Sequence, residues 1–139
     1  MRPTDDEMIA LAREAAHHAY APYSSFPVGA AILLSDGRVV TGCNVENASY
    51  GLTICAERTA MTRAIISGTD APGTGHPTPP KIEAVAIVGL QADLCYPCGA
   101  CLQVLSEFHC QRVIVAEHNQ PKSLNFTELL PYAFGLDSS

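Results

Sequence analysis

The sequence predicts an α/β fold in which one mixed sheet carries helices on both faces. Two observations favour it: helical and strand-like patterns alternate along the chain, and residues 82–90 form an almost continuous apolar run whose only charge is Glu83. Such a run is typical of a central strand covered on both sides. With 139 residues, the chain has the length of one ordinary domain, so we expect a single domain over residues 1–139.

The first half of the chain predicts a helix, a hairpin and a second helix. Thr4 and Glu7 form a capping box before apolar residues at helical spacing, so the first helix should run to about His18. Strands over 28–34 and 38–43 should pair antiparallel, because Asp36-Gly37 between them is a strong hairpin signal. A second helix is expected from about Cys55 to Ser67, with Gly68 ending it.

The second half adds a loop, two strands and two helices. Residues 69–80 are rich in proline and glycine and predict a surface loop. The strand over 82–90 should be followed by a helix over 99–108, a strand over 112–116 and a short helix over 125–130 that Pro131 terminates. These patterns contain four strands in all.

Composition narrows the class of function. Apolar residues make up 47% of the chain and charged residues 16%, and the formal charge is −6, so nucleic acid is a poor partner. The N-terminal segment 1–7 lacks the apolar core of a signal peptide, and no later run has the length of a membrane span. We therefore expect a soluble, cytoplasmic protein.

Three of the six cysteines predict a metal site. Cys98 and Cys101 form a C-x-x-C pair at the start of a predicted helix, and Cys55 starts another, where helix dipoles stabilise thiolates. Three sulfur ligands leave a fourth position of zinc open for water, as in catalytic sites, and Glu57 is suited to act as the base beside it. Arg58 is predicted to donate hydrogen bonds to the sulfurs and to offset their charge.

Other interpretations of these residues stay open from the pattern alone. Cys98 and Cys101 could form a redox dithiol, and zinc could stabilise a protein without catalysis. The five histidines show no zinc-binding spacing. Cys43, Cys95 and Cys110 are interpreted as buried, inert thiols.

Six segments, in order, resemble the small homotetrameric cytidine deaminases of the zinc-dependent cytidine and deoxycytidylate deaminase superfamily. They cover nearly the whole chain and comprise Ala19-Tyr20-Ala21-Pro22-Tyr23-Ser24, Phe26-Pro27-Val28-Gly29-Ala30, residues 41–51 (TGCNVENASYG), Cys55-Ala56-Glu57-Arg58, Pro97-Cys98-Gly99-Ala100-Cys101 and residues 129–135 (LLPYAFG). The resemblance implies a three-layer α/β/α sandwich with a mixed five-stranded sheet. It also implies hydrolysis of cytidine and 2'-deoxycytidine to the uridines and ammonia, in pyrimidine salvage.

The resemblance also implies roles for individual residues. One Zn²⁺ per chain, held by Cys55, Cys98 and Cys101, would activate water, and Glu57 would carry its protons to the base and to the leaving ammonia. The substrate-binding residues would be Phe26 against the base, Asn44 and Glu46 on the ribose, Ala56, and Tyr50 and Phe134 across subunit interfaces of a homotetramer.

The chain departs from the family pattern at Tyr96, where a small residue is usual, and at Leu102, where arginine is frequent. A bulky residue at position 96 could change the choice of substrate. A related deaminase of a modified cytosine nucleoside, such as a blasticidin-type antibiotic, is the alternative enzyme; the ribose pair Asn44 and Glu46 argues against it.

Overall fold

A mixed sheet of five strands forms the centre of the computed structural model, which describes residues 2–67 and 80–136. The strands are β1 (Val28–Leu34), β2 (Val39–Cys43), β3 (Ile82–Gly89), β4 (Arg112–Glu117) and β5 (Gln120–Asn125), and their order in the sheet is β2-β1-β3-β4-β5. Only the β3–β4 pair is parallel; β1 pairs antiparallel with both β2 and β3, and β4 with β5. The mixed sheet expected from the sequence is therefore confirmed.

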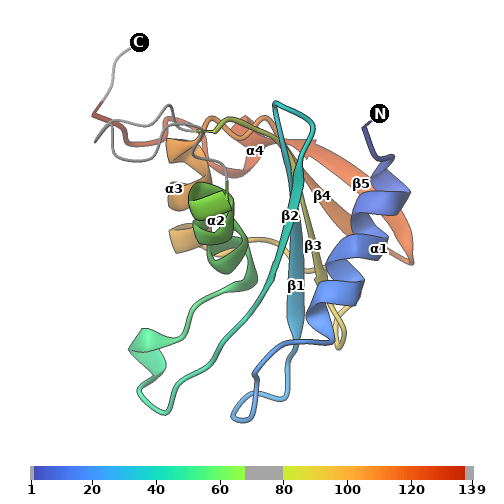
Figure 1. Ribbon diagram of the computed structural model, residues 1–139, viewed down its shortest axis with the longest axis vertical. Helices are drawn as coiled ribbons and strands as arrows, with labels where there is room; N and C mark the ends of the chain where they lie inside the picture. The colour runs from blue at the N-terminus through green and yellow to red at the C-terminus, as the bar shows by residue number, and fades with distance from the viewer. Residues whose placement is uncertain (1, 68–79, 137–139) are drawn as a thin grey trace.

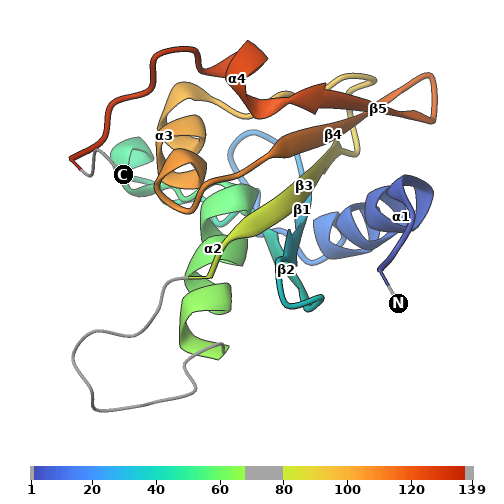
Figure 2. The same cartoon turned by 90° about the horizontal axis from the view of Figure 1, so that it is seen from above.

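Helices cover both faces of this sheet. The helix α1 (Asp5–Ala16) lies on one face, and α2 (Ala56–Ser67) and α3 (Gly99–Glu107) lie on the other, as Figures 1 and 2 show. The short α4 (Phe126–Leu129) follows β5, and a 3-10 turn spans Tyr50–Leu52. The three layers expected from the resemblance are confirmed.

Each face of the sheet has its own apolar core. Met8 and Ala12 of α1 pack with Ala31, Ala86 and Ile114 on one side. On the other side, residues of α2 and α3 pack with alternate residues of the same strands. The largest fully buried residues of this second core are Ile32, Leu34, Met61, Ile82, Ile87 and Leu105. Because both faces are covered, β3 is buried almost throughout, which explains its continuous apolar run.

Two glycines let the helices approach the sheet closely. A Cβ atom on Gly29 of β1 would lie 1.9 Å from the carbonyl oxygen of Ala12 in α1. On the opposite face, a Cβ on Gly42 of β2 would lie 2.4 Å from the backbone nitrogen of Ala60 in α2. These contacts set the spacing of the layers, including that of α2, whose first residues follow Cys55.

The structure also shows what the sequence patterns missed. The strand β5 was not among the four strands predicted from them; its residues are polar and mostly exposed, and it is held at the sheet edge by pairing with β4. The helix α1 ends at Ala16, two residues before the predicted end. The predicted helix stop at Gly68 and the loop up to Pro79 lie outside the described residues.

Within the described part of the chain, no helix is both long and apolar enough to cross a membrane.

Candidate active site

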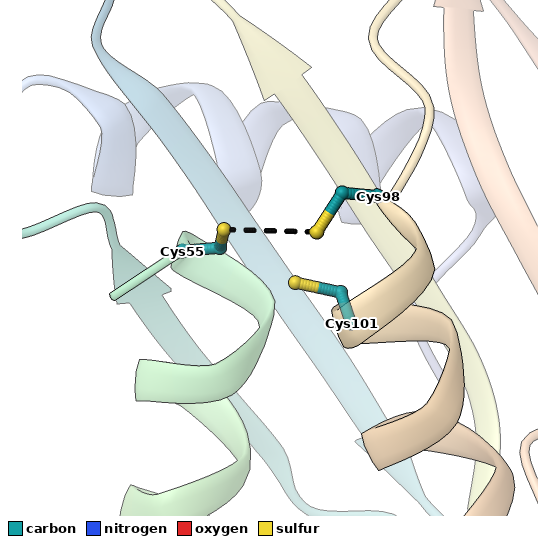
Figure 3. Close-up of side chains that lie close together, drawn as sticks. All are labelled: Cys55, Cys98 and Cys101. Atoms are coloured by element: carbon teal, nitrogen blue, oxygen red, sulfur yellow. Dashed lines mark hydrogen bonds between the residues drawn. The ribbon is translucent and has the colours of Figure 1, made fainter. Parts of the chain in front are cut away.

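Three cysteine sulfurs converge between the N-termini of α2 and α3. Cys55 immediately precedes α2, Cys98 caps the N-terminus of α3, and Cys101 lies in its first turn. Their Sγ atoms all lie within 4.8 Å of one another, and those of Cys55 and Cys98 are 3.9 Å apart (Figure 3). Among the described residues, this is the only group of three or more such side chains that could hold a metal ion.

The donor set fits zinc. Thiolates are ligands that Zn²⁺ prefers, and three of them on adjacent helix ends leave one tetrahedral position for water or substrate. Since the positive ends of two helix dipoles point toward the sulfurs, negative charge on them is stabilised. The convergence of Cys55 with the C-x-x-C pair favours a metal centre over a redox dithiol.

Arg58 supports the same cluster from α2. Its Nη2 donates a hydrogen bond to Cys55 Sγ at 3.4 Å, as the sequence predicted for this cation. Hydrogen bonds from Cys101, then from Arg58 and Cys98, lower the pKa of Cys55 to about 5. The pKa of Cys101 is raised instead, because its thiol donates to Cys55 and is buried. A bound divalent cation would favour the deprotonated form of the sulfurs that hold it.

Glu57 is a buried carboxyl group beside this cluster. It follows Cys55 by two residues in the first turn of α2, and it is only 4% exposed. Burial, followed by the charge of Cys55, raises the pKa of Glu57 to about 7. A carboxyl group with a pKa near neutrality can both accept and release a proton, as a general acid and base requires.

A cavity of about 170 Å³ connects these groups. It is lined by Glu57, Ala56, Cys55 and Cys98 from the metal side, and by Asn44, Val28, Thr53, Cys95 and Tyr96 around them. The expected site residues Asn44, Ala56 and Glu57 are therefore brought together with two of the three cysteines. Tyr96 also lines this cavity, although it is 44% exposed.

Glu46 lies in an adjoining cavity of about 390 Å³ with Tyr23, Ser24 and Tyr50, and Thr53 lines both spaces. Its carboxylate accepts hydrogen bonds from the backbone nitrogens of Tyr23 and Ser24, at 3.0 and 3.1 Å, and from the Ser24 hydroxyl. The Ser24 hydroxyl bond is the main reason why the pKa of Glu46 is lowered.

The expected aromatic residues occupy different places. Phe26 does not line the 170 Å³ cavity, but its ring lies close to Gly89, near the sulfur of Cys95, which does line it. Tyr50 is 76% exposed and makes an edge-to-face contact with Tyr23. Phe134 is 70% exposed, and its carbonyl oxygen accepts a hydrogen bond from Gln103. Neither Tyr50 nor Phe134 lines the 170 Å³ cavity within this chain.

The interpretation of three cysteines as buried and inert holds only in part. Cys110 is buried, which raises the pKa of its thiol to about 12. Cys43 and Cys95 are partly exposed, and Cys95 lines the cavity beside Glu57. The sequence did place Cys95 three residues before Cys98, but that spacing alone did not distinguish a cavity wall from the core.

Known proteins resemble this chain over most of its length. A cytidine deaminase of Mycobacterium tuberculosis is 46% identical over 126 residues, which cover 91% of this chain and 86% of that protein. One from Halalkalibacterium halodurans is 42% identical over 130 residues, 91% of each chain. The crystal structure of cytidine deaminase from Burkholderia pseudomallei matches with a TM-score of 0.80 and 42% identity, covering 95% of this chain and all of that one.

The family model for the cytidine and deoxycytidylate deaminase zinc-binding region matches residues 2–117, a range that includes the three cysteines, Glu57 and the whole cavity described above. This chain therefore belongs to the cytidine and deoxycytidylate deaminase family.

Proposed function

We propose that this chain is a zinc-dependent hydrolase that converts cytidine and 2'-deoxycytidine, and some base-modified analogues, to the corresponding uridines and ammonia. The observation that carries the proposal is the position of Glu57, a buried carboxyl group in the same cavity as the cysteine cluster. The relatives named above are cytidine deaminases, which favours this substrate over an antibiotic of the blasticidin type.

Cys55, Cys98 and Cys101 would hold the zinc ion. When bound, zinc supplies Lewis-acid chemistry that lowers the pKa of water and generates a nucleophile near neutral pH. Arg58 keeps the Cys55 sulfur in position and partly neutralises its charge.

Glu57 moves the protons of the reaction. It takes one from the attacking water and delivers it to N3 of the cytosine ring, which makes carbon 4 more electrophilic. The hydroxide left by this transfer adds to carbon 4. Glu57 then takes the proton of the new hydroxyl group and passes it to the amine nitrogen, so that a carbonyl forms at carbon 4 as the carbon–nitrogen bond breaks and neutral ammonia leaves. Burial suits Glu57 to both transfers, because it raises the pKa of the carboxyl group above that of an exposed glutamate.

The remaining site residues bind and orient the nucleoside. Phe26 packs against the base, Ala56 provides part of the wall beside it, and Asn44 and Glu46 hydrogen-bond the ribose hydroxyls. Val45 between them bridges to Tyr20 and Ile54 in an extended conformation, which supports the idea that Asn44 and Glu46 face one sugar.

Further copies of the chain would complete the site in a homotetramer. This is supported by apolar side chains that stay exposed around it, including Tyr23, Tyr50, Leu52 and Ile54. Phe134 and Tyr50 would reach a neighbouring subunit's pocket. We further propose that the enzyme, as one catalytic domain over residues 1–139, acts in the cytoplasm in pyrimidine salvage, where six free thiols remain reduced.

The test is turnover measured together with zinc content. We expect purified protein with about one zinc per chain to convert both cytidine and deoxycytidine, followed by loss of cytosine absorbance and by ammonia release. A zinc-loaded protein that leaves both nucleosides unchanged would contradict the proposal.

A further inference from the structure

Cys95 is a fourth sulfur in the candidate site, and it does not belong to the metal cluster found among the described residues. It lines the 170 Å³ cavity together with Glu57, Tyr96 and Cys98. Since three sulfurs already account for the zinc ligands, the Cys95 side chain is available for another role.

The Cys95 thiol lies beside the aromatic ring expected to pack against the base. A Cβ atom built on Gly89, at the end of β3, would be 3.4 Å from Cys95 Sγ and 3.1 and 3.2 Å from two ring carbons of Phe26. The thiol and the ring therefore both lie near the same point of the backbone, at the end of β3. A change in the size of residue 95 should therefore change the space in which the base is proposed to lie.

Cys95 also lines a second cavity. It has a volume of about 130 Å³ and is lined by Arg13, Asp93, Asn119 and Gly89, among others, and by Cys95 itself. Among the described residues, Cys95 is the one that lines both this cavity and the 170 Å³ cavity. Shortening its side chain is therefore expected to enlarge the space beside Glu57 and Tyr96.

We infer that Cys95 is a specificity-determining residue whose side chain limits the size of the substituent that the pocket accepts beside the reacting carbon of cytosine. The inference rests on the proposed function. Carbon 4 must lie near Glu57 and the cysteine cluster, so a group on carbon 5 or on the amine nitrogen would occupy the same small cavity, which Cys95 also lines. One methyl-sized group in such a pocket changes kcat/KM by roughly 10-fold to 200-fold.

The experiment compares Cys95→Ala, which enlarges the pocket, with Cys95→Val, which narrows it. For each variant, kcat/KM is measured for cytidine, 5-bromocytidine and N4-methylcytidine. We expect the ratio of analogue to cytidine to rise about tenfold in Cys95→Ala for at least one analogue, and to fall in Cys95→Val. The analogue that responds identifies which position of the base faces residue 95.

Two controls separate size from thiol chemistry. Cys95→Ser removes the thiol but changes the side-chain volume less than Cys95→Ala does. Its ratio of analogue to cytidine kcat/KM should therefore stay within about threefold of the wild-type ratio. Cys43→Ala removes a partly exposed thiol that lines a different cavity, with Ala15, Thr41 and Thr59, and should leave the ratio unchanged. Zinc content and thermal unfolding are checked for every variant.

A binding measurement gives a result independent of turnover. Equilibrium titration of the zinc-loaded proteins gives the Kd of 5-bromouridine and the Kd of uridine. If carbon 5 is the position that faces residue 95, the ratio of these two Kd values should be lower in Cys95→Ala than in the wild type. If the amine nitrogen faces residue 95, the ratio should stay unchanged. Unchanged kcat/KM ratios in both Cys95→Ala and Cys95→Val, or a change in Cys95→Ser as large as in Cys95→Ala, would overturn the inference. Turnover of cytidine by the wild type tests the proposed function by itself, whereas only the analogue ratios test Cys95.

Discussion

Asn44 holds the backbone of Phe26 in place. Its Nδ2 donates to the Phe26 carbonyl oxygen at 3.0 Å, and its Oδ1 accepts from the Val28 nitrogen at 2.9 Å. One N–H and one lone pair of this amide remain available for a ligand. Asn44 therefore links the segment carrying the expected base-packing ring to the cavity that Asn44 itself lines.

Replacing Asn44 should affect stability and substrate binding together. Asn44→Ala leaves two partly buried backbone groups without partners, so we expect a loss of about 2 kcal/mol in the free energy of unfolding and a raised KM for cytidine. Denaturant unfolding and steady-state kinetics measure the two effects. Asn47→Ala is the matched control, because Asn47 is exposed and its side chain accepts one hydrogen bond, from the nearby backbone nitrogen of Ser49. An equal loss of stability in this control would contradict the role of Asn44 in holding the backbone of Phe26 and Val28.

Glu57→Gln should abolish turnover without removing the metal. The amide keeps the shape of the side chain but cannot carry protons, and such transfers contribute about 100-fold to 10,000-fold to rate. Because Glu57 serves in two transfers, we expect kcat to fall about 1,000-fold or more, with zinc per chain unchanged by metal analysis. Loss of zinc from this variant would mean that Glu57 is structural.

Gly29→Ala should destabilise the fold strongly. Its Cβ would lie 1.9 Å from a backbone oxygen of α1, which can move only if the helix shifts from the sheet. We expect the free energy of unfolding to fall by at least about 2 kcal/mol, measured by denaturant unfolding at one protein concentration. Gly51→Ala, where a Cβ meets no atom within 4 Å, should change it by less than about 0.5 kcal/mol. An equal loss of stability in the two variants would show that the close approach of α1 to Gly29 does not cause the destabilisation.

Tyr96→Ser should alter the preference among cytidine analogues. Tyr96 lines the cavity where the family usually has a small residue, so its removal opens the pocket near Cys98. We expect kcat/KM ratios for substituted cytidines to change by more than twofold, and a full pocket effect is worth roughly 1 kcal/mol. The variant Tyr96→Phe keeps the ring and removes the hydroxyl group, so it shows which of the two affects the kcat/KM ratios. If the kcat/KM ratios of Tyr96→Ser stay within twofold of those of the wild type, Tyr96 has no role in the choice among cytidine analogues.

Ser24→Ala should raise the pKa of Glu46. The Ser24 hydroxyl stabilises the ionised carboxylate in the folded protein and so holds its pKa below the ordinary value. The interaction therefore favours the folded state at neutral pH, and this contribution is lost as the pH falls through the lowered pKa. Carbon-13 NMR titration of the Glu46 carboxyl group should give a higher midpoint in the variant. An unchanged midpoint would mean that the backbone N–H groups of Tyr23 and Ser24 lower the pKa of Glu46 without the Ser24 hydroxyl.

The local elements of this fold follow from local chemistry. The capping box of Thr4 and Glu7 starts α1, Asp36-Gly37 joins β1 to β2, and the apolar run after Lys81 forms the central β3. Each of these signals acts between residues close in the chain, which is why the residue pattern alone predicted them. The edge strand β5 escaped prediction because it is held by backbone pairing with β4 and buries little apolar surface.

The sequence by itself determined which residues could do the chemistry: three cysteines, one glutamate beside the first of them, and helix starts that stabilise thiolates. Only the tertiary structure decided that the sulfur of Cys55, more than forty residues before Cys98, lies 3.9 Å from that of Cys98, and that Cys95 lines two cavities. The physical reason is that such proximity depends on how α2 and α3 pack on one face of the sheet. That packing is set by many long-range contacts, among them the close approach at Gly42, and no short motif encodes it.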